Sequence, residues 1–156
     1  MVKSCILMLA VYAATASSSA AADDELFFDG FQLALPAINE IVTDGPESDA
    51  VEFFNRSFAT ADLSGWYFTD SQATVRYTFT AGTLLPGRAF LVVNALPFGL
   101  STSDAVILRT PQDVLFQSFS WSSHPVQGGS YSRCPDGVGS FLSVAPTTLG
   151  AENACP

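Results

Sequence analysis

The stretch from residue 105 to residue 121, AVILRTPQDVLFQSFSW, decides the fold class of this 156-residue chain. Two runs rich in aliphatic and aromatic residues, Ala105–Leu108 and Val114–Trp121, flank the polar segment 110–113. Short apolar runs on either side of a turn sequence are typical of a β-hairpin. The stretch therefore predicts two antiparallel strands joined by a tight turn.

The same pattern extends along most of the chain. From Ala37 onward, short apolar runs recur about every 8–14 positions and are separated by turn residues. This spacing is typical of a β-sandwich or barrel, and the sequence has neither a βαβ alternation nor a repeat. We therefore predict one all-β domain of about eight strands. The other predicted strands are Ile38–Val42, Val51–Asn55, Trp66–Thr69, Val75–Phe79, Ala89–Val93 and Tyr131–Arg133.

Three of these strands carry predictions about burial. Val75, Tyr77 and Phe79 alternate with polar residues, so we expect them on the buried face of a strand. Trp66 follows a glycine turn and is predicted to fill the core, because large aromatic side chains bury much area. The almost unbroken apolar run Ala89–Val93 predicts a central strand.

The first 36 residues have a different character. Lys3 precedes the apolar run Cys5–Ala14, and small residues end at Ala22, which is the pattern of a secretory signal peptide cleaved after residue 22. The run has about half of the ~20 residues that a membrane-spanning helix needs. Residues 23–36 mix acidic and aromatic side chains, and we interpret them as a linker, with a recognition segment as the alternative. The predicted organisation is a signal peptide (1–22), a linker (23–36) and a β-sandwich with a disulfide-tied tail (37–156).

Charge restricts the classes of partner. Removal of residues 1–22 leaves five arginines, no lysine and 15 acidic residues, a formal charge of −10. Nucleic-acid binding depends on Lys and Arg that neutralise phosphates, so this surface predicts no nucleic-acid partner. The short apolar run predicts no membrane insertion. We expect a secreted, periplasmic or cell-envelope protein whose partner is a protein or a surface polymer outside the cytoplasm.

Two cysteines remain after cleavage, Cys134 and Cys155. An even number of cysteines in an exported chain favours a disulfide. It would close a loop of about 20 residues and contribute roughly 3 kcal/mol by the loop-entropy model.

Catalytic and cofactor motifs are missing from the sequence. The single histidine, His124, is not accompanied by a nucleophile elbow, and no phosphate loop, dinucleotide fingerprint or zinc-protease motif is present. We therefore predict that the chain is not an enzyme, has no catalytic residues and has no cofactor. The one alternative is Ca²⁺, because Asp44, Glu47 and Asp49 place three carboxylates on one loop. An acidic solvated turn is the simpler interpretation of this weak metal-site candidate.

The order of these segments resembles the lamin-tail domain of exported bacterial proteins. The match extends over about residues 37–153, and each motif is weak by itself, whereas their shared order is specific. The motifs are Ile38-Asn39-Glu40-Ile41, Val51-Glu52-Phe53-Phe54-Asn55, Asp62-Leu63-Ser64-Gly65-Trp66, Leu85-Pro86-Gly87, Phe90-Leu91-Val92-Val93, Asp104-Ala105-Val106-Ile107-Leu108 and Pro135-Asp136-Gly137.

The resemblance implies an Ig-like sandwich and a non-catalytic binding or scaffold module. Two other classes stay open. One is a carbohydrate- or Ca²⁺-dependent surface-binding sandwich, in which Trp121, Tyr67 or Phe68 would stack on sugars. The other is a hydrolase.

Two acidic residues within predicted strands are expected to have basic partners. Glu40 and Glu52 lie in predicted strands, and a cross-strand partner such as Arg76 or Arg133 would neutralise them.

Overall fold

All regular structure of the described residues is β-strand. The computed structural model describes residues 35–43 and 49–156, and every strand pairing in it is antiparallel. The predicted all-β class and the Ig-like sandwich are confirmed. The strands are β1 (Pro36–Val42), β2 (Ala50–Asn55), β3 (Ala61–Asp62), β4 (Tyr67–Thr69), β5 (Arg76–Thr78), β6 (Leu84–Leu85), β7 (Phe90–Val93), β8 (Asp104–Arg109), β9 (Leu115–Trp121), β10 (Ser130–Cys134) and β11 (Ser140–Val144).

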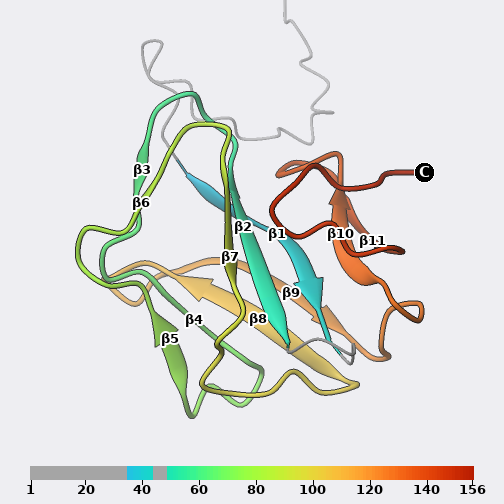
Figure 1. Cartoon of the computed structure of the whole chain (residues 1–156). Helices are drawn as coiled ribbons and strands as arrows, with labels where there is room; N and C mark the ends of the chain where they lie inside the picture. Colours follow the sequence, from blue (N-terminus) through green and yellow to red (C-terminus); the bar gives the residue numbers. More distant parts are fainter. Residues whose placement is uncertain (1–34, 44–48) are drawn as a thin grey trace, which may run out of the picture.

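Two sheets form the layers of the sandwich (Figure 1). One sheet has the order β11-β10-β1-β2-β7 and the other has the order β5-β4-β8-β9, while β3 and β6 form a separate two-stranded ribbon. The predicted hairpin is confirmed, because β8 pairs with β9 from Asp104–Trp121 to Arg109–Leu115. The described part of the chain contains no helix that could span a membrane. The predicted signal peptide and residues 23–34 of the predicted linker lie outside the described residues.

The core lies between the sheets and is aromatic at its centre. The rings of Phe53 on β2 and Phe68 on β4 lie 5.1 Å apart, and Phe79 packs edge-on against Phe53 at 5.3 Å. All three side chains are at most 3% exposed. Tilted and edge-on ring pairs are the geometries that aromatic quadrupoles favour, so this cluster joins the two sheets.

Two predictions about burial are wrong. Strand β7 lies at the edge of its sheet, whereas its apolar run predicted a central position. The run is apolar on both faces because Phe90 packs on Phe54 on the outer side, with the ring centroids 4.7 Å apart. Val75 is 46% exposed, because β5 begins only at Arg76 and leaves Val75 in the preceding loop.

Trp66 lies at the margin of the core and not at its centre. The side chain is partly buried and packs edge-on against Phe116, with centroids 5.0 Å apart. Gly65, directly before it, has φ +75°, a conformation that strains any residue with a Cβ atom. The turn residue is thus conformationally required, whereas Trp66 closes one side of the sandwich.

The C-terminal region contains a strand that the sequence did not predict. Strand β11 pairs with β10 along its whole length, after which the chain crosses back to the disulfide. The segment was predicted as an irregular tail because of its Gly, Pro, Ser and Thr content. Residues 146–155 do form a strap without regular strand structure, and this strap covers one outer face of the sandwich.

Candidate ligand-binding site

The outer face of the four-stranded sheet contains an open hollow of about 400 Å³. Ligand-binding clefts have volumes of roughly 300–1,000 Å³, so the hollow is large enough for a small ligand. Its wall is formed by β4, β5, β8 and two loops. The lining residues are Tyr67, Thr69, Ala73, Thr74, Val75, Arg76, Ile107, Arg109 and Asp113.

Strand alternation explains why these side chains meet. Phe68 points into the core, so its neighbours Tyr67 and Thr69 point to the outer face. On the adjacent strands, Arg109 lies opposite Tyr67 and Arg76 lies opposite Thr69. The short strand β4 is therefore flanked by one arginine on each side.

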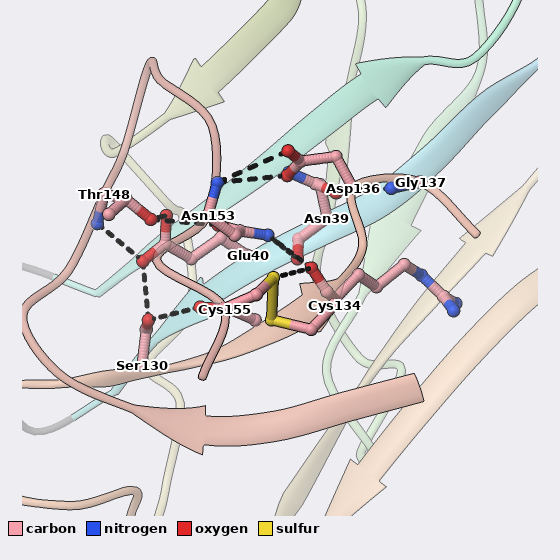
Figure 2. The surroundings of a disulfide bond; sticks show 11 residues. Asn39, Glu40, Ser130, Cys134, Asp136, Gly137, Thr148, Asn153 and Cys155 are labelled. Carbon is pink, nitrogen blue, oxygen red and sulfur yellow. Dashed lines mark hydrogen bonds between the residues drawn. A yellow bond between two sulfur atoms is a disulfide. The ribbon is translucent and has the colours of Figure 1, made fainter. Parts of the chain in front are cut away.

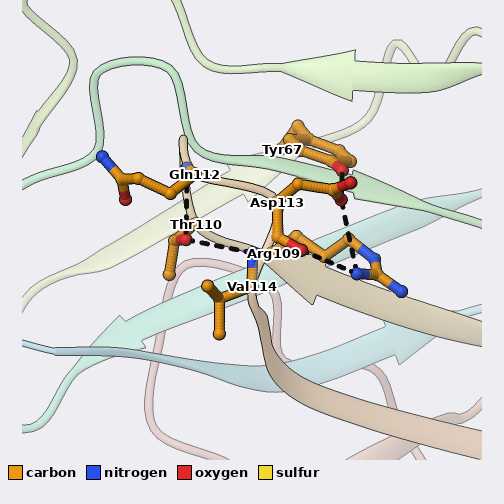
Figure 3. Close-up of polar contacts among 6 residues, drawn as sticks. All are labelled: Tyr67, Arg109, Thr110, Gln112, Asp113 and Val114. Carbon is orange, nitrogen blue, oxygen red and sulfur yellow. Dashed lines mark hydrogen bonds and ion pairs between the residues drawn. The ribbon is translucent and has the colours of Figure 1, made fainter.

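Asp113 lines the hollow and makes polar contacts with Tyr67 and Arg109 (Figure 3). The Tyr67 hydroxyl donates a short hydrogen bond to Asp113 Oδ1, and this bond raises the pKa of Tyr67 above its ordinary value. Arg109 donates to the Asp113 carbonyl at 2.9 Å and forms an ion pair with Oδ1 at 3.3 Å. Both contacts to the carboxylate use Oδ1, which leaves Oδ2 facing away from these partners.

Arg76 is held differently from Arg109. Its guanidinium lies over the ring of Tyr67, 4.7 Å from the centroid, in a cation–π contact. Within residues 35–43 and 49–156, no carboxylate lies within 4.0 Å of this guanidinium. The hollow therefore contains a positioned cation that forms no ion pair with a described acid, in the same lining as Asp113.

The floor of the hollow contains a polar group without a partner. Thr69 is 5% exposed, and among the described residues its hydroxyl is the buried side-chain polar atom that makes no hydrogen bond. Buried hydroxyls are almost always hydrogen-bonded, and an exception calls for a functional or structural reason.

Two lining residues have left-handed backbone conformations. Ala73 has φ 54° and Asp113 has φ 64°. Left-handed conformations are costly for residues other than glycine and concentrate at ligand-binding sites. Both residues belong to loops that line the hollow.

The outer face of the other sheet is closed by a buried polar network (Figure 2). Glu40 and Glu52 are register partners on β1 and β2, and both are 0% exposed. Glu40 accepts hydrogen bonds from Ser130 Oγ at 2.5 Å and from the Thr148 amide at 2.9 Å. Glu52 accepts from Asn39 Nδ2 at 2.8 Å and from the Gly150 amide at 2.5 Å. The strap residues thus satisfy the two buried carboxylates.

The expected ion pairs of these glutamates are wrong. Arg133 Nε donates to the Ile38 carbonyl at 2.7 Å, and its guanidinium lies over the Phe141 ring at 4.4 Å. Arg76 lies on the other sheet. The donors that reach Glu52 from the described residues are neutral. Burial is the main cause that raises its pKa to about 7, and repulsion from Glu40 and Asp136 adds to it. The network is a structural feature of the covered face.

A glycine is required where the network meets the following turn. The Gly137 amide donates to Asn39 Oδ1 at 2.8 Å, and Gly137 has φ +70°. A Cβ atom there would lie 2.6 Å from Arg56 Cγ and 2.7 Å from Phe54 Cδ1. Close packing therefore explains the glycine of the Pro135-Asp136-Gly137 motif.

His124, the candidate base of the hydrolase alternative, lies between two threonines. Its Nδ1 is 2.7 Å from Thr43 Oγ1 and its Nε2 is 2.8 Å from Thr102 Oγ1. These contacts connect the end of β1 to the loop before β8. The geometry is that of a side chain that joins two loops.

The predicted metal loop is only partly within the described residues. Asp44 and Glu47 lie outside them, and Asp49 Oδ2 accepts the Leu100 amide at 2.6 Å. Among the described residues, no group of three or more His, Cys, Asp or Glu side chains is arranged to hold a metal ion. The one located candidate therefore has a structural partner.

The predicted disulfide is present. Cys134 at the end of β10 is bonded to Cys155 in the strap, with Cα atoms 5.4 Å apart. It lies beside the buried network, where Asn153 Nδ2 donates to the Arg133 carbonyl at 2.9 Å. The bond therefore fastens the strap to the sheet that it covers.

The three aromatic residues considered for sugar stacking do not form a platform. Phe68 is fully buried, and Trp121 is 7% exposed with its Nε1 donating to the Ser101 carbonyl at 2.9 Å. Tyr67 is 9% exposed and lies beneath Arg76. Sequence reasoning named Tyr67 for its ring and did not connect it with the arginines beside it. Arg76 occurs at an outward-facing position of the predicted strand Val75–Phe79, whereas Arg109 lies between a predicted strand and the predicted turn.

The family match of this chain agrees with its Ig-like architecture. Residues 36–123 match the model of the Lamin Tail Domain, which is more than half of the chain and includes β1 to β9. None of the curated proteins compared with the chain matches it. The matched segment contains every residue that lines the hollow. The lamin tail domain is an Ig-like, non-enzymatic module, and this chain belongs to the lamin tail domain family.

Proposed function

We propose that this chain is a non-catalytic binding module that acts outside the cytoplasm and binds its partner in the hollow on the β5-β4-β8-β9 sheet. One observation carries the proposal: Arg76 lies in a hollow without an acidic partner among the described residues, in a chain of net charge −9. An exposed but positioned cation on an acidic protein favours a ligand that needs it. The partner is a protein or a surface polymer.

Export is supported by two independent features. The Cys134–Cys155 disulfide is typical of oxidising compartments, and the first 22 residues have the composition of a secretory signal peptide. Both features fit a secreted or cell-envelope protein of the exported bacterial type. The domain boundaries at residues 22 and 36 belong to the same proposal.

A capture experiment tests the function. The chain is immobilised and incubated with cell-envelope material and culture medium from its source cells, alongside the Arg76→Gln/Arg109→Gln double variant. We expect the native chain to retain a component that the double variant loses. Equal retention by both chains would remove the hollow from the proposal.

The same experiment distinguishes the proposed function from the Ca²⁺-dependent alternative. A chelator added to a parallel sample should leave retention unchanged, because Asp113 is the one carboxylate among the described residues that line the hollow and Ca²⁺ takes about six to eight oxygen ligands. Retention that requires Ca²⁺ would favour that alternative instead.

A further inference from the structure

We propose that the hollow binds a hexuronic acid unit of an acidic polysaccharide, with its carboxylate on Arg76 and Arg109 and its ring hydroxyls on Asp113. The inference rests on the proposed function, because it names the ligand class of the same site.

The two arginines indicate a planar anion. Guanidinium groups bind carboxylates through parallel hydrogen bonds, and Arg76 and Arg109 reach the hollow from the strands on either side of β4. A uronic acid carries one negative charge per sugar unit, so each bound unit is repelled less by the net charge of −9 than a phosphate dianion would be. A monoanionic carboxylate is therefore preferred over a phosphate dianion.

Asp113 indicates that the same ligand also donates hydrogen bonds. Its side chain is 76% exposed and lines the hollow, and the contacts from Tyr67 and Arg109 both reach Oδ1. A ligand with carboxylates alone would be repelled by this group. A sugar acid adds hydroxyl donors, which the exposed Asp113 carboxylate can accept.

The walls of the hollow fit a sugar ring. Ile107 and the 46% exposed Val75 provide apolar surface for the C–H face of the ring, between polar groups at each end. The volume of about 400 Å³ accommodates one or two rings.

Three probes test the ligand class by titration at low salt: trigalacturonate, its fully methyl-esterified form, and a blocked triglutamate peptide. We expect trigalacturonate to bind with a Kd on the order of 1 mM and the other two at least about ten-fold more weakly. Triglutamate binding as tightly as trigalacturonate would show an acidic peptide site and overturn the inference. Equal binding of the methyl ester would also overturn it.

Variants locate the binding in the hollow. Arg76→Gln should weaken trigalacturonate binding about ten-fold, because a charge-assisted contact is lost. Arg88→Gln is the matched control, since Arg88 lies over the rings of Phe54 and Phe58 and does not line the hollow. Thermal melting of both variants checks that they are folded, and Arg109→Gln replaces Arg76→Gln if the latter is not. Unchanged binding in a folded hollow variant would overturn the inference.

Asp113→Asn tests the hydroxyl contacts. Asparagine tolerates the left-handed backbone at φ 64°, so the turn is kept while the charge is removed. The preference for trigalacturonate over triglutamate should fall from about ten-fold toward one. If all three probes fail while the double arginine variant still loses its captured component, the uronic acid class is wrong and the proposed function stands.

Discussion

The charged residues on the two outer faces of this sandwich differ in sign and in burial. On the β11-β10-β1-β2-β7 face, Glu40 and Glu52 are fully buried under a disulfide-tied strap and bonded to neutral donors. On the β5-β4-β8-β9 face, Arg76 and Arg109 line an open hollow. A covered charge is part of the fold, whereas an exposed and positioned charge is available to a ligand. The comparison predicts large stability effects on the first face and small ones on the second.

The largest expected effect follows replacement of Asn39, which connects the network. Its amide donates to Glu52 and Asp136 and accepts the Gly137 amide. Asn39→Ala should cost about 3–5 kcal/mol, because several buried polar groups lose their partner together. Thr78→Ala on the open face is the matched control and should change stability by less than ~0.5 kcal/mol. Denaturant unfolding measures the stability of both variants. Equal unfolding midpoints for the two variants would mean that the two faces contribute equally to stability.

The disulfide gives the next largest effect. The Cys134→Ser/Cys155→Ser double variant should lose about 3 kcal/mol, since the cross-link joins residues 21 positions apart. The loss should disappear when the native chain is measured in reducing buffer, because both chains then lack the bond. If the native chain is as stable in reducing buffer as in oxidising buffer, the strap is held by its hydrogen bonds alone.

A smaller effect appears as a dependence on pH. The pKa of Glu52 is raised from 4.5 to about 7, mainly by burial, so the folded state binds its proton more tightly than the unfolded state. This contribution is fully present below pH 4.5 and is lost as pH rises to about 7. Stability should therefore fall by roughly 2–3 kcal/mol across that window. Glu52→Gln should remove this slope, and a variant with the same slope as the native chain would assign it to another group.

The contrast between the faces also separates what the sequence predicted from what it did not. The hairpin of β8 and β9 was predictable, because alternation and a polar turn are local signals. Glu40 and Glu52 were expected to have arginine partners, but apart from Asn39 their donors come from residues about 90–110 positions away, such as Thr148 and Gly150. Contacts at that separation leave no periodic signal in the sequence. The hollow depends likewise on three strands meeting, so Arg76 and Arg109 appeared unrelated before the fold was known.

The smallest effect in this series lies on the open face and concerns Tyr67. Its hydrogen bond to Asp113 raises the pKa of the phenol, so Asp113→Asn should lower that pKa toward the ordinary value near 10. Stability should change by less than ~1 kcal/mol, because the Asp113 side chain is 76% exposed. Site-resolved NMR titration of the tyrosine rings, with Tyr131 as the internal reference, measures the shift. An unchanged Tyr67 pKa would mean that the phenol and the carboxylate are not bonded in solution, and the polar end of the hollow would then lack its anchor. A lowered pKa with little loss of stability would instead establish that this face can be altered without affecting the fold, which is the property that distinguishes a binding surface from a covered one.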